Sequence, residues 1–341
     1  MKILSLVVPA YNSEKFLDKG IPSMLAPEIL DKLEIIIVND GSTDGTAAAA
    51  EKYCVQYPDT VRLINQENKG HGGALNTGFS AAVGKFIKPV DSDDWVQTEN
   101  LVSLIRCLET CESDAVLTHF RTVDISNGEI INFKSHPEAY GTPMSTEQIL
   151  KDWRSFYRCV TFHGVAYRRE FYQQKAMGLS EHVFYEDNEY ATFPFCLAET
   201  VTAYDLFVYE YRVGDVNQSV AVANQIKRLS HLEQVGDRMV AAYTKLPASA
   251  GKTIAGLKTQ AVLSQYLDLA LLAHPDRKKG RAMAADVVAR YHQAAPEIDS
   301  ILKNKYRVLV AMSYLHISKK TLEKVLNSRI YNRLRGNRQF D

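Results

Sequence analysis

Four short, largely apolar segments near the N-terminus each end in a polar or glycine-rich loop, and this alternation constrains the fold more than any other feature. The segments are residues 3–8 (ILSLVV), 33–38 (LEIIIV), 61–64 (VRLI) and 85–90 (KFIKPV). Apolar runs that do not alternate with polar residues are typical of strands covered on both faces. Helical patterns fill the stretches between them. The sequence therefore predicts an α/β fold with a mostly parallel central sheet.

The loops that follow these strands carry the most distinctive polar residues of the chain. They span residues 9–12, 39–46, 66–73 and 91–94. In parallel α/β sheets ligands bind at the carboxyl ends of the strands, so the four loops are expected to meet at one edge. The sequence thus predicts a ligand site built from segments that lie far apart in the chain.

Asp91, Asp93 and Asp94 place three carboxylates within four residues, directly after the fourth predicted strand. Carboxylates this close repel one another unless a cation joins them. Mg²⁺ and Mn²⁺ in proteins are commonly held by one or two carboxylates together with substrate phosphates. A D-x-D sequence on its own could equally be a solvated acidic turn. Because three other polar loops are expected at the same edge, we predict a Mn²⁺ or Mg²⁺ site that binds a nucleotide diphosphate.

Composition restricts the class of protein further. The 341-residue chain has 40 Lys and Arg against 40 Asp and Glu, but residues 301–341 carry ten basic residues against two acidic ones. The five cysteines show no C-x-x-C spacing, which predicts reduced thiols rather than a disulfide framework or a zinc site. No apolar stretch approaches the roughly eighteen residues of a membrane span, and none is typical of a signal peptide. We expect a cytoplasmic protein without a nucleic-acid partner.

The second half of the chain changes from mixed to helical patterning. Further strands are expected at residues 115–123, 160–167 and 206–211, with a surface excursion over 124–146. From residue 224 onward the apolar pattern is helical. We therefore predict an α/β domain over 1–220, followed by a C-terminal helical region with a basic tail over 221–341.

Five motifs occur in order along the predicted α/β domain: VPAYN (8–12), VNDGSTDGT (38–46), NKGHGGALNTG (68–78), VDSDDW (90–95) and YEDNEY (185–190). In this order and at these spacings the chain resembles the family 2 glycosyltransferases with the GT-A fold, especially bacterial members that build polysaccharides. The resemblance implies a Rossmann-like sheet with helices on both faces, divided into a nucleotide-binding half (1–97) and an acceptor half (98–220). It also implies inverting transfer of a sugar from a nucleotide diphosphate, usually a UDP-sugar, to an acceptor hydroxyl.

The resemblance assigns the first four motifs to donor and metal binding. Tyr11 and Asp40 could hold a nucleobase by stacking and by accepting its ring N–H, while the glycines and Lys69 suit the approach of a diphosphate. The resemblance implies Asp93 as the principal ligand of Mn²⁺ or Mg²⁺, with Asp91 reaching the metal or the ribose. The donor-binding residues are expected to be Pro9, Tyr11, Asn12, Asp40, Lys69, Gly72, Gly73, Asn76, Asp91 and Ser92.

The acceptor hydroxyl must lose a proton, and a carboxylate with a raised pKa can take it. The pattern of the family places this general base at Asp187 in YEDNEY, with Glu186 as the alternative. Without the resemblance, these residues are typical of an exposed acidic turn. His163 could lie at the edge of the core, or it could face the acceptor. Contacts to the acceptor or the diphosphate are expected from Trp95, His163, Arg212 and Gln218.

The expected partners are a nucleotide-sugar donor and a glycan or lipid-linked acceptor. The basic residues after 301, with apolar side chains between them, could lie on an anionic membrane surface at the inner face of the cell membrane. The C-terminal helices could form a homodimer. One alternative is a nucleotide-sugar-binding scaffold without catalysis. A sugar-1-phosphate nucleotidyltransferase fits less well, because VPAYN is not the glycine-rich, basic phosphate loop expected after its first strand. The sequence identifies neither the sugar nor the acceptor.

Overall fold

The computed structural model describes residues 1–215, 222–318 and 321. The predicted contact residue Gln218 and most of the basic tail therefore lie outside the described residues. The chain divides into two compact units. The first comprises Met1–Val216 and Leu246–Ala255, and the second comprises Asn217–Lys245 and Gly256–Asp341.

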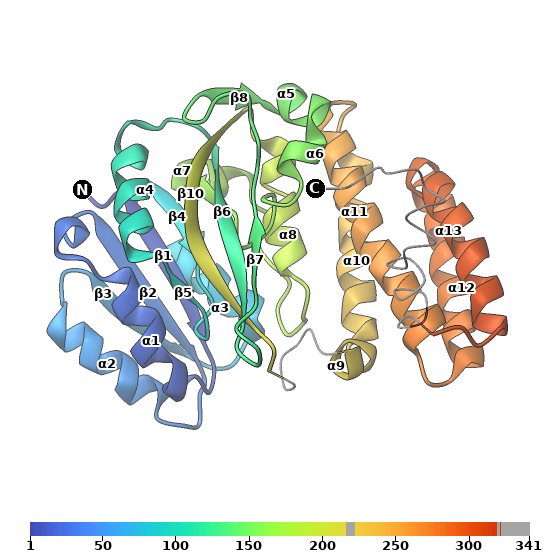
Figure 1. Cartoon of the computed structure of the whole chain (residues 1–341), viewed down its shortest axis with the longest axis horizontal. Helices are drawn as coiled ribbons and strands as arrows, with labels where there is room; N and C mark the ends of the chain where they lie inside the picture. Colours follow the sequence, from blue (N-terminus) through green and yellow to red (C-terminus); the bar gives the residue numbers. More distant parts are fainter. Residues whose placement is uncertain (216–221, 319–320, 322–341) are drawn as a thin grey trace. The chain divides into compact units, whose positions relative to one another are not determined.

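The first unit is built on a mixed ten-stranded sheet whose main path runs β3-β2-β1-β4-β9-β6-β10-β5 (Figure 1). Strands β1 to β4 pair in parallel, as do β6 and β10, whereas β5, β7, β8 and β9 pair antiparallel to their neighbours. The parallel set thus includes the four strands predicted first. The strands are β1 (Leu4–Ala10), β2 (Leu33–Asp40), β3 (Val61–Gln66), β4 (Phe86–Pro89), β5 (Trp95–Val96), β6 (Ala115–Asp124), β7 (Ile130–Phe133), β8 (Pro143–Ser145), β9 (Val165–Arg168) and β10 (Thr200–Val213).

Helices cover both faces of this sheet. Leu6 and Val8 of β1 face one buried cluster and Val7 faces the other, which explains why the strand is apolar at every position. One face packs on α1 (Glu14–Met24), α2 (Thr46–Gln56) and α4 (Thr98–Thr110). The other packs on α3 (Gly70–Ala81), α5 (Thr146–Lys151), α6 (Trp153–Phe156), α7 (Arg169–Lys175) and α8 (Asp187–Thr192). The predicted α/β fold class, with helices on both faces of the sheet and helices after it, is confirmed. The sheet is mixed rather than mostly parallel, because β5, β7, β8 and β9 pair antiparallel to their neighbours.

Three local expectations differ from the structure. Helix α3 begins at Gly70 rather than near residue 74, so most of the glycine-rich loop is its first turn. The excursion over 124–146 contains β7 and β8, which add to β6 and β10. The strand expected over 160–167 forms only from Val165, because a turn precedes it in which the N–H groups of Gly164 and Val165 donate to the Thr161 carbonyl.

The second unit is helical, as predicted. Its elements are α9 (Val222–Lys227), α10 (Leu229–Lys245), the later part of α11 (Ala250–Asp268) with its π-helical extension Leu269–Ala273, α12 (Arg277–Ala294) and α13 (Pro296–Tyr314). Arg290 of α12 joins Asp237 of α10 (2.6 Å) and also contacts Glu233. No helix within the described part of the chain is long and apolar enough to cross a bilayer.

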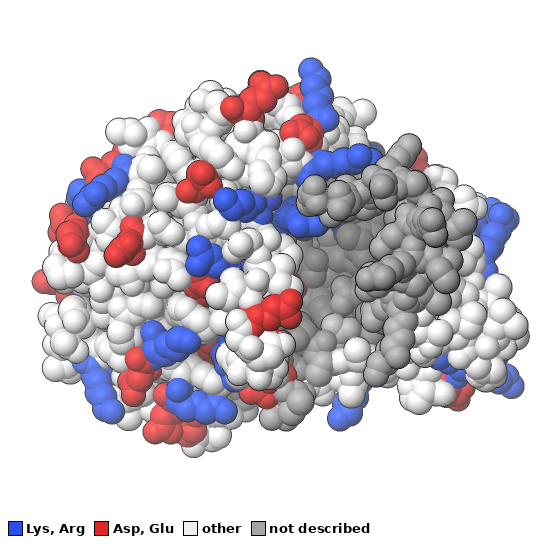
Figure 2. Space-filling model, viewed as in Figure 1, with Lys and Arg blue, Asp and Glu red and all other residues white. Residues whose placement is uncertain are grey.

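Charges on the face of the molecule in Figure 2 are mixed rather than segregated. On this face, lysine and arginine side chains lie interspersed with aspartate and glutamate side chains (Figure 2).

Strand β4 carries a lysine whose side chain is fully buried. Lys88 is 0% exposed, and its ammonium nitrogen donates to the carbonyl oxygens of His163 (2.6 Å) and Val165 (3.4 Å). Burial lowers the pKa of Lys88 from 10.5 to about 7, and the neighbouring Cys159 thiol opposes this only in part. The lysine thus anchors the backbone that leads into β9.

Replacing Lys88 by Met should change how stability depends on pH. Between about pH 7 and about pH 10, the unfolded chain holds a proton that folded Lys88 releases, so the free energy of unfolding rises with pH. One such group contributes at most ~1.4 kcal/mol per pH unit. In urea unfolding series we expect K88M to flatten this rise, whereas K52M, on the exposed surface of α2, should leave it. An unchanged slope in K88M would mean that Lys88 keeps its charge in the fold.

Candidate functional site

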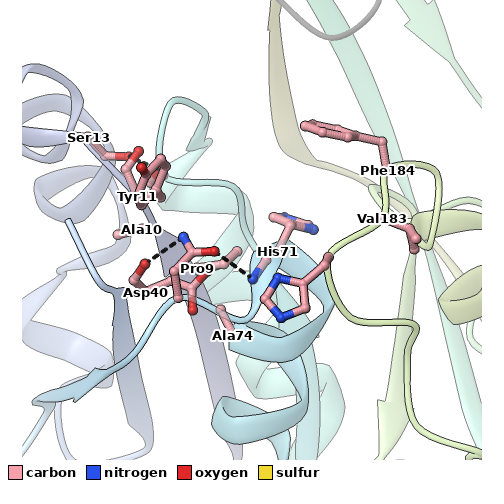
Figure 3. Close-up of a pocket in the computed structure, with 13 residues that line it drawn as sticks. Pro9, Ala10, Tyr11, Ser13, Asp40, His71, Ala74, Val183 and Phe184 are labelled. Carbon is pink, nitrogen blue, oxygen red and sulfur yellow. Dashed lines mark hydrogen bonds between the residues drawn. The ribbon is translucent and has the colours of Figure 1, made fainter. Parts of the chain in front are cut away.

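A cavity of about 390 Å³ lies at the carboxyl ends of β1 and β2 (Figure 3). Of the predicted donor residues, Pro9, Tyr11, Asp40 and Ser92 line it. Tyr11 and Phe184 lie on opposite sides of it in Figure 3. The other lining residues, which were not among the predicted donor-binding residues, are Ala10, Ser13, Asn68, Gly70, His71, Ala74, His182, Val183 and Phe184.

Asp40, at the end of β2, is a buried carboxylate fixed by its neighbours. Its Oδ1 accepts from the side-chain amide of Gln66 (2.7 Å) and from the backbone N–H of Lys69 (2.8 Å). The side-chain amide of Asn68 donates to the Asp40 carbonyl (2.9 Å). A fixed carboxylate and the half-exposed ring of Tyr11 border one cavity, so this end can hold a flat ring that donates an N–H.

Asn12 shapes the cavity rather than lining it. Its side-chain oxygen accepts from the Thr43 N–H (2.9 Å), and its own N–H donates to the Ser42 hydroxyl (3.0 Å). The hydroxyls of Ser13 and Ser92 lie 2.7 Å apart. These bonds tie the loops after β1, β2 and β4 together, as expected for loops at one sheet edge.

The first turns of α3 pack against the segment 178–186. A Cβ on Gly72 would lie 2.2 Å from the Ser180 carbonyl oxygen, so only glycine fits there. The side chain of Asn76 pairs with the backbone of Leu179, donating to its carbonyl (2.9 Å) and accepting its N–H (2.8 Å). The structure therefore packs Gly72 and Asn76 against this segment, and neither residue lines the cavity.

Lys69 and Gly73 lie at the same turn. The Lys69 carbonyl accepts the N–H of His182 (2.9 Å), and Gly70 has φ +77° with the His182 backbone against it. A Cβ on Gly73 would lie 2.4 Å from Cβ of Lys69. The glycine-rich motif thus allows another backbone segment of the same chain, the one around His182, to approach it closely.

Asp94 is the most buried carboxylate of the acidic stretch. Its Oδ2 accepts from the Tyr209 hydroxyl (2.5 Å) and its Oδ1 from the Arg212 N–H (2.7 Å). The Tyr209 oxygen in turn accepts the N–H of Asp91 (3.0 Å). Burial, followed by the charges of Asp91 and Asp93, raises the pKa of Asp94 well above its ordinary value. The three aspartates are therefore close enough to interact strongly.

Arg212 and Trp95, both predicted contact residues, also lie beside this stretch. The Arg212 guanidinium is 3.6 Å from Asp93 Oδ2 and 3.0 Å from Asp215 Oδ2. Trp95 belongs to β5, and the Lys19 ammonium lies 2.9 Å from the centroid of its ring. The positive charge of Arg212 is thus placed to offset part of the negative charge of Asp93.

Asp91, Asp94 and His163 form a group that could hold a metal ion. One ligand atom from each lies within 4.8 Å of the other two. Burial lowers the pKa of His163 to about 4, which leaves a neutral imidazole with a lone pair. Two carboxylates and an imidazole fit Mn²⁺, and the carboxylates fit Mg²⁺. This group contains Asp91, as the predicted ligand set does, but it has Asp94 and His163 in place of Asp93.

The two candidate general bases differ in their surroundings. Glu186 is only 3% exposed, and its Oε1 lies 2.5 Å from Nδ1 of His71. Asp187, the first residue of α8, is partly exposed and accepts from the Asn188 amide (3.1 Å). Burial and nearby acidic charges, Asp187 among them, raise the pKa of Tyr211. The ring of Tyr211 stacks on that of His163, with the ring centroids 4.3 Å apart.

His71 is the functional candidate that sequence reasoning did not single out. Its Nε2 lies 2.8 Å from Asp91 Oδ1, and its Nδ1 contacts Glu186. Burial alone would lower the pKa of His71, but Asp91 and Glu186 raise it well above its ordinary value. The residue stands inside the quoted glycine-rich motif, yet nothing in the motif indicates a partner 115 residues later.

Replacing Tyr209 by Phe should destabilise the fold by about 1–3 kcal/mol, because the Asp94 carboxylate and the Asp91 N–H both lose a buried partner. Urea unfolding at neutral pH measures this loss. Tyr157→Phe is a matched control, because the hydroxyl it removes belongs to a side chain that is 45% exposed. Equal stability of the two variants would contradict a structural role for the Tyr209 hydroxyl.

Comparisons with known proteins agree with the motifs. Residues 5–174, about half of the chain, match the family model described as Glycosyl transferase family 2. The chain is 29% identical to the putative glycosyltransferase EpsH of Bacillus subtilis over 218 residues, which cover 62% of this chain and 60% of that protein. It is 32% identical to chondroitin synthase of Escherichia coli over 158 residues, covering 45% of this chain and 22% of that protein. For several curated relatives the chain spans between 52% and 61% of their length.

Solved structures share the architecture. A crystal structure of S. aureus TarS in complex with UDP-GlcNAc superposes with a TM-score of 0.63 at 18% identity, covering 100% of this chain and 94% of that one. At this identity the likeness concerns the fold alone. It confirms the GT-A architecture expected from the five motifs.

Proposed function

The chain belongs, through residues 5–174, to glycosyl transferase family 2, and we propose that it transfers a sugar from a nucleotide diphosphate donor to an acceptor hydroxyl with inversion at the anomeric carbon. One observation carries this proposal. The cavity bordered by Tyr11 and Asp40 extends to Ser92, within the acidic stretch that holds Asp91 and Asp94.

The donor that we propose is a UDP-sugar. Uracil is small and flat and has one ring N–H, which matches an exposed aromatic ring and a fixed carboxylate acceptor at one end of the cavity. TarS, whose fold this chain shares, was solved with UDP-GlcNAc, which supports a uridine nucleotide. The identity of the sugar would be set by residues farther along the site.

We propose that Mn²⁺ or Mg²⁺ is held by Asp91 together with either Asp93 or the pair Asp94 and His163. Such an ion would neutralise the charge that develops on the departing diphosphate. Arg212 would add a fixed positive charge beside Asp93. Both ligand sets use oxygen donors from the acidic stretch, which suits either ion.

Asp187 is proposed as the general base. It would accept the proton of the acceptor hydroxyl while that oxygen bonds to the anomeric carbon and the bond from this carbon to the diphosphate oxygen breaks. One displacement of this kind inverts the configuration. Glu186 is less suited to the role, because it is buried and directed at His71.

The acceptor that we propose is a glycan or a lipid-linked oligosaccharide in polysaccharide or glycoconjugate synthesis. Similarity to chondroitin synthase of Escherichia coli supports a polysaccharide. We place the reaction in the cytoplasm, with the basic residues 301–341 at an anionic membrane surface. A homodimer through the C-terminal helices would be compatible with this arrangement.

Transfer from labelled nucleotide sugars, with Mn²⁺ present, tests the proposal. Asp187→Asn should lower kcat by at least ~100-fold, because a general base contributes about 10²- to 10⁴-fold. UDP should still raise the melting temperature of this variant. Asp59→Asn, an exposed carboxylate before β3, should behave as the unaltered chain. Near-normal transfer by D187N would refute the base, and binding of UDP-sugars without turnover by the unaltered chain would favour a scaffold.

A second set of variants separates the two metal-ligand sets. Removing a true ligand should raise the Mn²⁺ concentration needed for half-maximal activity by at least ~10-fold. Asp93→Ala should do so if Asp93 is the principal ligand, and His163→Ala if the group with Asp94 holds the ion. Titration of each variant with Mn²⁺, monitored by electron paramagnetic resonance, compares their affinities for the ion without turnover. No change in either variant, with transfer retained after chelation, would contradict metal use.

A further inference from the structure

His71 connects two carboxylates that lie far apart in the sequence of the first unit. Asp91 follows β4, and Glu186 precedes α8. The imidazole lies between them, with Nε2 at 2.8 Å from Asp91 Oδ1 and Nδ1 at 2.5 Å from Glu186 Oε1. Because both nitrogens face carboxylate oxygens, both can donate, which suits a ring that carries two N–H groups. The ring of Phe162 packs beside it, with centroids 5.7 Å apart.

Two residues of the segment that carries Glu186 have backbone conformations that are unfavourable for residues with a Cβ. His182 and Tyr185 have φ of 57° and 77°, in the left-handed region that disfavours residues with a Cβ. Ser180 is fixed at the start of the segment, where its N–H (2.8 Å) and hydroxyl (2.7 Å) both donate to the buried Glu189. At the other end, Glu186 directly follows the strained Tyr185 and bonds to His71.

Electrostatics favour the same arrangement. Glu186 is 3% exposed, and a buried carboxylate is costly unless it is paired. His71 supplies a partner to it and to Asp91 at once. Without the imidazole, two carboxylates would face each other across the space that it occupies, and their repulsion would push α8 away from the end of β4.

We infer that His71 is a positioning residue for the transfer reaction, which by linking Asp91 to Glu186 fixes the neighbouring Asp187 relative to the donor end of the site. The inference rests on the proposed function for its catalytic meaning. In this interpretation the glycine-rich motif, through His71, also holds the segment that carries the general base. It also explains Glu186 as the partner of His71.

Four variants test this link by two independent readouts: His71→Ala, His71→Arg, Glu186→Gln and the double variant H71A/E186Q. With labelled nucleotide sugars, H71A should lower kcat by ~10- to 100-fold through misplacement of Asp187. Because the substitutions at His71 and Glu186 break the same link, the kcat of the double variant should be no lower than that of the less active single variant. H71R, whose fork can reach two carboxylates, should recover part of kcat.

Hydrogen exchange of the segment 178–190 supplies the readout that does not need turnover. H71A and E186Q should each raise its exchange by at least ~10-fold, whereas His136→Ala, at an exposed position, should not. Unchanged exchange in a folded H71A or E186Q, or additive losses of kcat in the double variant, would overturn the inference. If the unaltered chain transfers no sugar, the proposed function fails, and the exchange experiment still decides whether the link exists.

Discussion

Carboxylates crowd the carboxyl edge of the sheet, and the arrangement of the site depends on how their charge is balanced. Asp94 is held by the Tyr209 hydroxyl and the Arg212 N–H, and Asp93 lies near the Arg212 guanidinium. Asp91 is paired with His71. The compensating groups come from β10 and α3, so the balance can form only when both elements are packed against the end of β4. Folding and assembly of the site are thereby coupled.

The sheet explains why these parts meet. β1 pairs in parallel with both β2 and β4, so the loops that follow the three strands open on the same side. β10 returns beside β5, which brings Tyr209 and Arg212 to the residues just after β4. Strand β10 runs in the same sense as β4, because β9 pairs antiparallel with both β4 and β6, and β6 pairs in parallel with β10. The carboxyl-terminal part of β10 therefore brings side chains from the second half of the domain to the same edge of the sheet.

Local patterns in the sequence were sufficient for β1 to β4 and for part of the site. The continuous apolar runs predicted β1 to β4, and the residues that end β1 and β2 predicted Tyr11 and Asp40 beside the cavity. Contacts between distant segments were out of reach, because a motif does not specify what packs on it. His71 with Glu186 is the clearest case, since the two are 115 residues apart. The early start of α3 was missed because glycine is unfavourable within helices, and only the close approach of Ser180 makes Gly72 necessary.

The central claim is that the cavity at the ends of β1 and β2 holds the nucleotide of a sugar donor, with the diphosphate directed to the acidic stretch. A crystal structure of the chain with UDP and Mn²⁺ tests this most directly. We expect the uracil ring against Tyr11 with its N–H on Asp40, and the diphosphate joined through Mn²⁺ to Asp91 and its neighbours. UDP bound elsewhere, or bound there with its diphosphate directed away from Asp91, would contradict it.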